Sequence, residues 1–195
     1  MRYLACFFVF LFCAVTISAQ ENNTDILKET KIDFCGVDFS MAKVVGADEG
    51  IDKFPSVFLG INQLFVDEAK KYNLEYFLNK TSVNIDLSAV RKSNEAIDCS
   101  LLFKDSGIEL TKQQIEQKIQ SYNLEAKNSL GFVIIVQNLN KAKLQGEYYF
   151  VFFDTKTRKI ASSMLLSAAP KGFGLRNYWA GSIYSALNKY RKIKP

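Results

Sequence analysis

Residues 131–168 read GFVIIVQNLNKAKLQGEYYFVFFDTKTRKIASSMLLSA, and this stretch decides the fold. It contains three runs rich in β-branched and aromatic residues, at positions 131–139, 147–154 and 160–168. The polar connections between them, at 140–143 and 155–158, are too short for a crossover helix. We therefore predict three consecutive strands in an antiparallel meander. The continuously apolar segment 132–136 predicts that the first of them is a central strand, covered on both faces.

On both sides of the meander, segments with helical and with strand periodicity alternate. Strands are predicted at 32–45, 83–89 and 99–103, and helices at 55–72, after 111 and at 175–192. The order is strand, helix, strand, strand, helix, meander, helix. It predicts an α/β fold (α+β by stricter accounting), with helices packed on a mixed sheet of about five to six strands.

Local patterns support individual elements. Pro55 stands where a helix would start, and the apolar residues after it recur at helical spacing. Thr111 and Gln114 have the spacing of a capping box. Alternation in the first strand predicts one apolar face, made by Cys35, Val37, Phe39 and Met41. Asp38 is expected on the opposite, polar face.

The first 20 residues, MRYLACFFVFLFCAVTISAQ, have the features of a secretory signal peptide. Arg2 supplies a positive start, an apolar run of about 14 residues follows, and Ala19 ends a small-residue cleavage site. The run is shorter than the roughly 20 residues that a bilayer-spanning helix needs. An uncleaved N-terminal anchor is the alternative. We expect cleavage after Ala19 and export to the periplasm or the extracellular space, with no further membrane contact.

The remaining chain is expected to be one unit. Residues 20–31 are polar and predict a flexible arm, whereas residues 32–195 contain no linker, repeat or low-complexity tract and predict a single globular domain. Loss of Arg2 with the signal lowers the net charge from +5 to +4, which is too little to predict binding to nucleic acid. Two cysteines remain, Cys35 and Cys99. In an oxidising compartment they can pair, and the alternative is two buried thiols acting as small apolar residues.

The chain contains no histidine. This absence excludes Ser-His-Asp catalysis, Cys-His catalysis and histidine-ligated zinc, because each requires an imidazole. Two cysteines cannot form an all-cysteine zinc site. Neither a Walker-type loop nor a G-x-G-x-x-G motif occurs. We therefore assign no catalytic residue and expect no metal and no cofactor.

Acidic residues leave one enzymatic alternative, a hydrolase that acts through a pair of carboxylates, for example on glycans. Four of them lie on or at the ends of predicted strands: Asp33, Asp38, Asp86 and Asp154. A metal site with oxygen ligands could use the loop residues Asp48, Glu49 and Asp52. These three lack the spacing of a calcium loop, and a solvated acidic loop is the simpler interpretation.

Residues 170–184, PKGFGLRNYWAGSIY, carry the candidate binding patch. Glycines flank an aromatic residue just before a helix, and an arginine, an amide and two aromatic residues crowd its first turn. The candidate residues are Gly172, Phe173, Gly174, Arg176, Asn177, Tyr178 and Trp179. The alternative is structural: the glycines turn the chain, Phe173 and Trp179 plug the sheet edge, and Arg176 pairs with a carboxylate.

The same region carries a family resemblance. FFDTKT at 152–157 and GFGLRNYWA at 172–180 resemble F-F-D-x-x-T and G-F-G-x-R-N-Y-W-A in the C-terminal part of a family of exported bacterial proteins. The likeness covers about 33 residues, 152–184. It implies a hydrophobic hairpin that leads into a terminal helix. No activity is assigned to that family, so the resemblance implies no catalytic residue.

These patterns together predict a non-catalytic envelope protein that binds another envelope protein or a small ligand. The carboxylate hydrolase is the alternative, and it requires two carboxyl groups that face each other in a concave pocket. The basic tail at 189–194 is expected to complement the dipole of the last helix rather than to bind a membrane.

Overall fold

Strand β4 (Leu130–Asn140) is the centre of the protein, and every one of its residues is buried. In the computed structural model, which describes residues 24–125 and 129–193, β4 pairs antiparallel with β5 (Gln145–Asp154). Strand β5 pairs antiparallel with β6 (Ile160–Ala168). The predicted meander is confirmed, and so is the coverage of its first strand on both faces. The predicted signal peptide lies outside the described residues and stays a prediction.

The other half of the sheet is parallel. Strand β1 (Lys31–Asp38) runs parallel to β4 on one side and to the short edge strand β3 (Ser82–Ile85) on the other. Strand β2 (Lys43–Val45) pairs with β4 beyond the end of β1. The described residues thus form one six-stranded mixed sheet in the order β3-β1-β4-β5-β6, with β2 beside β4. The predicted α/β class is confirmed.

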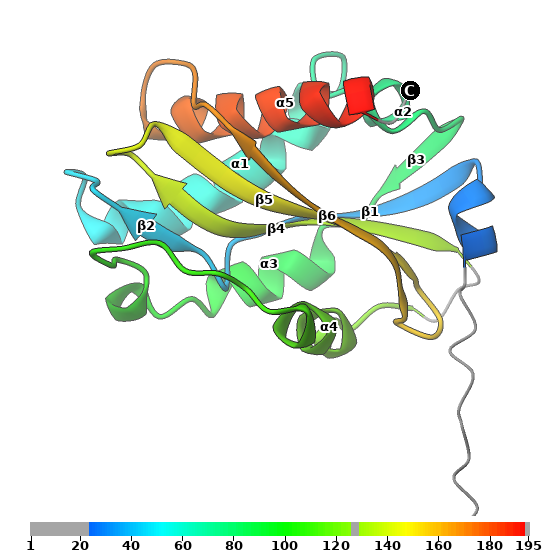
Figure 1. Ribbon diagram of the computed structural model, residues 1–195. Helices are drawn as coiled ribbons and strands as arrows, with labels where there is room; N and C mark the ends of the chain where they lie inside the picture. Colours follow the sequence, from blue (N-terminus) through cyan, green and yellow to red (C-terminus); the bar gives the residue numbers. More distant parts are fainter. Residues whose placement is uncertain (1–23, 126–128, 194–195) are drawn as a thin grey trace, which may run out of the picture.

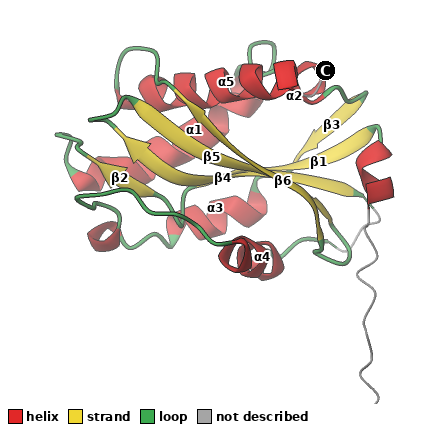
Figure 2. Cartoon of the chain, viewed as in Figure 1, coloured by secondary structure: helices red, strands yellow, loops and turns green. Residues whose placement is uncertain are grey.

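Helices cover both faces of the sheet (Figure 1, Figure 2). One face carries α1 (Phe54–Asp67), α2 (Leu74–Leu78) and α5 (Leu175–Ile193). The other face carries α3 (Ser88–Glu95) and α4 (Lys112–Ser121). Each face buries its own apolar cluster, and the cluster under α1, α2 and α5 is the larger. The short helix α2 has no counterpart among the sequence-based predictions.

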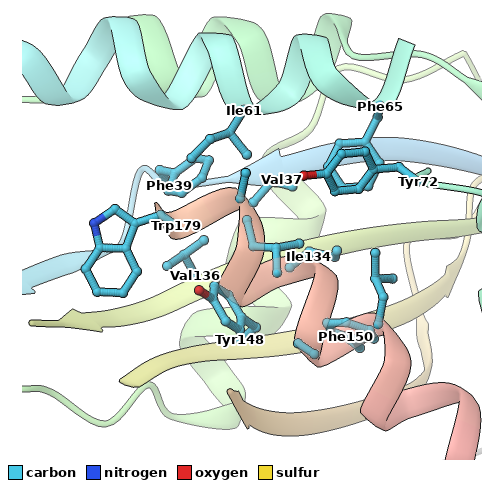
Figure 3. Packing of buried hydrophobic residues seen from close by; sticks show 14 of the residues in the cluster. Val37, Phe39, Ile61, Phe65, Tyr72, Ile134, Val136, Tyr148, Phe150 and Trp179 are labelled. Carbon is cyan, nitrogen blue, oxygen red and sulfur yellow. The ribbon is translucent and has the colours of Figure 1, made fainter. Parts of the chain in front are cut away.

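Aromatic rings fill the larger cluster (Figure 3). The rings of Phe39 and Phe58 stack with their centroids 4.0 Å apart, and those of Phe132 and Phe152 stack at 4.7 Å. Trp179 of α5 is fully buried in the same cluster. Burial of a large apolar side chain contributes about 1.5–3 kcal/mol, so these contacts hold α1 and α5 to the sheet.

The predicted strand at 32–45 is interrupted, and its predicted faces are wrong. At Gly36 the backbone has a φ of 105°, and the register of β1 against β4 shifts between Phe34 and Val37. This bulge places Cys35 and Val37 on opposite faces of the sheet instead of the same face. Residues 39–42 then leave the strand before β2 begins.

The two short strand predictions that follow are corrected as well. Strand β3 ends at Ile85, and Ala89 lies in α3. The Asp86 carboxylate accepts the N–H of Ser88, the first residue of the helix, at 3.0 Å, in an Asx turn that precedes α3. Residues 99–103 form the 3-10 helix η3 (Cys99–Leu101), followed by a single isolated bridge at Phe103. A short alternating segment such as 83–89, or a short apolar run such as 99–103, is compatible with a strand and with a helix. The packing of each segment decides between the two.

The predictions for the helices agree with the structure more closely than those for the short strands. The capping box is present: Thr111 Oγ1 accepts the N–H of Gln114 at 3.2 Å, and Gln114 Oε1 accepts the N–H of Thr111 at 2.9 Å. The predicted helix at 55–72 is α1, which ends earlier, at Asp67. The described part of the predicted flexible arm is folded, because η1 (Thr24–Lys28) packs on β6 and its apolar side chains reach the larger cluster.

Candidate binding site

The loop between β6 and α5 presents the most exposed large apolar side chain of the described residues. Phe173, at the loop tip, is 95% exposed. The flanking Gly172 and Gly174 have φ angles of 123° and 78°, a conformation that favours glycine. Figure 1 shows the loop standing away from the sheet at the start of α5. An exposed phenylalanine adds nothing to the core, so the packing of the protein does not explain its position.

Contacts with α5 hold this loop in place. The N–H of Lys171 donates to the carbonyl oxygen of Tyr178 at 3.1 Å. The carbonyl oxygen of Lys171 approaches Gly181 so closely that a Cβ atom at that position would overlap it. The loop therefore depends on a glycine within the helix, and it presents Phe173 in a defined position.

The other candidate residues divide between the surface and the core. Arg176 and Asn177 are exposed, and Arg176 Nε donates to Asn177 Oδ1 at 3.2 Å. Tyr178 is half-buried and lies edge-on to Trp179, with ring centroids 5.1 Å apart. Trp179 is fully buried (Figure 3), so it belongs to the scaffold and cannot contact a ligand. The accessible part of the patch is Phe173 with its flanking glycines, Arg176 and Asn177.

Three of the four candidate carboxylates accept hydrogen bonds at strand ends and in turns. Asp33 accepts hydrogen bonds from Asn84 Nδ2 at 2.8 Å and from Ser129 Oγ at 2.6 Å. Asp86 accepts a backbone N–H in the first turn of α3, and Asp154 accepts two in the turn between β5 and β6. These interactions are those of structural carboxylates, and they do not set up a pair on opposite sides of a pocket.

Asp38 is fully buried at the carboxyl end of β1, contrary to its predicted position on a polar face. The Tyr122 hydroxyl donates to Asp38 Oδ2 at 2.6 Å, and Lys118 Nζ lies 3.1 Å from the same oxygen. The N–H of Ser40 donates to Asp38 Oδ1 at 2.8 Å. Burial, and then the nearby Asp38 charge, raises the pKa of Tyr122 well above its usual value, so the phenol remains a donor. This sealed cluster stabilises the fold and offers no access to a substrate.

The acidic loop after β2 contacts a lysine. Lys141 Nζ lies 3.2 Å from Asp48 Oδ2 and 2.9 Å from Glu49 Oε1, and Asp52 lies apart in η2 (Ile51–Lys53). The lysine thus supplies the positive charge that a bound cation would bring. Across residues 24–125 and 129–193, no three His, Cys, Asp or Glu side chains cluster in a way that could hold a metal ion.

Both remaining cysteines are free thiols in the structure. Cys35 is buried in the smaller cluster, and Cys99 is partly exposed at the start of η3. Burial, and then the carboxylates of Asp33 and Asp86, raises the pKa of the Cys35 thiol to about 12. Cys35 is therefore packed as a small apolar residue, and in the structure it is not paired with Cys99.

A groove between α1 and α3 has no signal in the sequence. Its volume is about 360 Å³, and Leu59 and Leu87 contribute apolar surface. Arg91 and Glu95 bring charge to it. A wider adjoining section of about 560 Å³ shares these two residues. The walls come from two helices on opposite faces of the sheet, one of which was predicted to continue a strand, so no local pattern could indicate the groove.

The candidate patch and the groove are neighbours. Gly60 of α1 lines the groove, and Arg176 Cδ lies 3.1 Å from the position that a Cβ of Gly60 would take. Arg176 has no ion-pair partner among the described residues, so it does not make the predicted carboxylate contact.

Comparison of the chain with protein-family models, curated proteins and solved structures finds no match. The resemblance of residues 152–184 to exported bacterial proteins therefore stays a hypothesis. None of the helices in the described ranges is long and apolar enough to cross a membrane. The function has to be argued from the geometry of the site.

Proposed function

We propose that this chain is an exported, non-catalytic protein of the bacterial envelope that binds a partner protein through the loop between β6 and α5. The observation that carries the proposal is the 95% exposure of Phe173 on a loop held against α5. Aromatic side chains are enriched at the centres of protein interfaces, where they fill a pocket of the partner. A preformed loop also loses little conformational entropy when it binds.

The charges near Phe173 indicate the chemistry of the partner. Lys171 and Arg176 lie two residues before and three residues after Phe173 in the sequence, and both are exposed. A matching surface has an apolar pocket for one aromatic ring and carboxylates on its rim. Such rim charges steer association more than they add affinity.

The carboxylates favour binding over hydrolysis. Asp38 is saturated by Lys118, Tyr122 and a backbone N–H, and the other candidate acids serve turns and strand ends. A carboxylate hydrolase needs an acid and a base at opposite sides of an accessible substrate. The absence of histidine from the sequence separately excludes imidazole catalysis. Export rests on the N-terminal sequence, and Gln20 as the first residue of the protein in the envelope fraction would test it.

Site-specific photocrosslinking tests the proposed interface. A photoreactive phenylalanine analogue replaces Phe173 in the full chain, expressed in the cells that normally produce it. The same analogue at Leu144, an apolar residue that is 60% exposed between β4 and β5, is the matched control. We expect one discrete protein adduct from position 173 and none from position 144. Charge reversal, Lys171→Glu with Arg176→Glu, is expected to weaken that adduct.

Three results would overturn this proposal. Identical adducts from both positions would show nonspecific labelling, and an adduct that is insensitive to charge reversal would contradict the proposed acidic rim. If lipid rather than protein is labelled, and the purified chain binds anionic vesicles but not neutral ones, the occupant is a membrane surface.

A further inference from the structure

The groove between α1 and α3 lies where open α/β sheets bind their ligands. Strands β1 and β3 are parallel neighbours. The chain that leaves β1 reaches α1 on one face of the sheet, whereas the chain that leaves β3 enters α3 on the other face (Figure 1). Such a reversal leaves a crevice outside the carboxyl ends of the two strands. Asp86 and Leu87, directly after β3, line the groove, so it occupies this crevice.

The floor of the groove is rigid. Because β3 ends at Ile85, two buried amides pair with the exposed edge of β1 in its place. Asn62 accepts the N–H of Val37 at 2.7 Å and donates to the Val37 carbonyl at 2.9 Å. Asn94 accepts the N–H of Phe39 at 2.8 Å and donates to the same Val37 carbonyl at 2.9 Å. The backbone edge is therefore saturated, and it does not compete with a ligand for hydrogen bonds.

The bulge in β1 gives the groove its depth. A Cβ atom at Gly36 would lie 2.6 Å from both Asn62 Oδ1 and Val90 Cγ2, and 2.9 Å from Leu87 Cδ2. All three of these side chains line the groove. These side chains pack directly against β1 because position 36 has no side chain. A larger residue at position 36 would displace them toward the groove.

The two charged side chains that line both sections of the groove lack an explanation within the fold. Arg91 and Glu95 lie one helical turn apart on α3, and neither has a hydrogen-bond or ion-pair partner among the described residues. Glu95 is the last residue of α3, where the helix dipole disfavours a carboxylate. Arginine before glutamate is also the weaker order for an ion pair within one helix. Helix stability therefore does not account for this pair.

We propose that the groove binds a small zwitterion with an apolar side chain, an α-amino acid or a dipeptide. Arg91 donates two parallel hydrogen bonds to the ligand carboxylate, and Glu95 accepts from its ammonium group. The apolar side chain of the ligand packs against the partly exposed Leu59 and Leu87. The groove volume of about 360 Å³ falls within the range of about 300–1,000 Å³ that is typical of small-molecule sites. The wider section has room for a second amino-acid residue.

Isothermal titration calorimetry of the mature full chain tests this assignment with four probes. L-Leucine and L-leucyl-L-leucine carry both charges, leucine amide lacks the carboxylate, and 4-methylpentanoate lacks the ammonium group. We expect a probe with both charges to bind, and each probe that lacks one charge to bind about 10- to 100-fold more weakly. Tighter binding of the dipeptide than of leucine would identify a peptide as the natural ligand class.

Variants connect the binding to the groove. Arg91→Gln and Glu95→Gln are expected to weaken binding of the best probe about 10- to 100-fold without moving the unfolding midpoint, because both side chains are exposed. Leu59→Trp fills the groove and is expected to abolish binding. Lys104→Ala, another exposed cation that does not line the groove, is the matched control.

Three outcomes would overturn the assignment. They are the absence of heat with all four probes, leucine amide binding as tightly as leucine, and unchanged affinity in Arg91→Gln. None of these outcomes affects the photocrosslink expected at Phe173. The proposal for the groove and the proposal for the partner surface are therefore tested independently.

Discussion

Replacement of Asp38 by alanine probes how the interior of this protein is held together. Asp38 is fully buried, 2.6 Å from the Tyr122 hydroxyl and 3.1 Å from Lys118 Nζ. Tyr122 follows Asp38 by 84 residues, so these contacts join the end of β1 to α4 and the residue after it. Asp38→Ala removes the shared acceptor and leaves an ammonium group and a hydroxyl against an apolar interior.

The expected loss follows from the burial of the partners. Removal of one member of a buried ion pair costs about 3–5 kcal/mol, because the remaining charge stays desolvated without compensation. The Lys118 side chain is 15% exposed, so its ammonium can turn partly toward water, and we expect a loss at the lower end, about 3–4 kcal/mol. Lys118→Met in the Asp38→Ala background removes the uncompensated cation. The two substitutions should therefore couple by about 1–3 kcal/mol.

Urea unfolding followed by fluorescence measures both quantities, because Trp179 is the only tryptophan and is fully buried. Asp25→Ala is the control, since Asp25 and Lys28 form an ion pair whose side chains are 86% and 81% exposed and whose loss should not move the midpoint. The reasoning fails if Asp38→Ala unfolds at the same urea concentration as Asp25→Ala. It also fails if the losses for Asp38→Ala and Lys118→Met simply add.

Four other substitutions probe the candidate patch and the smaller cluster. Trp179→Ala should lower the free energy of unfolding, measured by circular dichroism, by about 3–5 kcal/mol. Phe173→Ala should leave that free energy unchanged, because the side chain is exposed. Equal losses in the two variants would contradict the assignment of Trp179 to the core and of Phe173 to the surface. Gly181→Ala forces a Cβ atom against the Lys171 carbonyl, so trypsin should cleave the native chain after Lys171 faster than in the wild type; an unchanged rate would show that the loop is not held there. The pKa of the Cys35 thiol is raised from 9.0 to about 12 by folding, so the unfolded thiol ionises first. The stability from this group is thus complete below pH 9.0 and is lost as the pH rises toward about 12, and Cys35→Ala should flatten that decline; identical slopes would refute the burial argument.

Elements with a local signal could be predicted from the sequence. The meander at 131–168 and the terminal helix follow from hydrophobic period and from connections too short to cross the sheet. The capping box at Thr111 follows from side chains three residues apart. The segment at 83–89 is a strand only as far as Ile85, which the sequence does not reveal because Ser88 and Ala89 suit a strand as well as a helix. The Asx turn at Asp86 and the packing of α3 on β1 distinguish the two.

For the candidate patch, the sequence established which residues are close along the chain and the structure established which of them a ligand can reach. Phe173 and Trp179 lie six positions apart. The helix turns Trp179 toward the sheet, while the glycine loop turns Phe173 into solvent. Exposure of an aromatic side chain depends on what packs over it, and a linear pattern does not contain that information.

Composition alone removed whole classes of chemistry, since a chain without histidine cannot carry out imidazole catalysis. The burial of Asp38 and the groove between α1 and α3 were decided only by the tertiary structure. Asp38 faces α4 because the bulge at Gly36 shifts the register of β1, and its partners Lys118 and Tyr122 come from α4 and the residue after it, 80 and 84 residues further along. The groove exists because β3 stops early and the helices after β1 and β3 cover opposite faces. Local periodicity reports which side chains are apolar, whereas the burial of a charge and the shape of a cavity depend on segments that meet only after the sheet has formed.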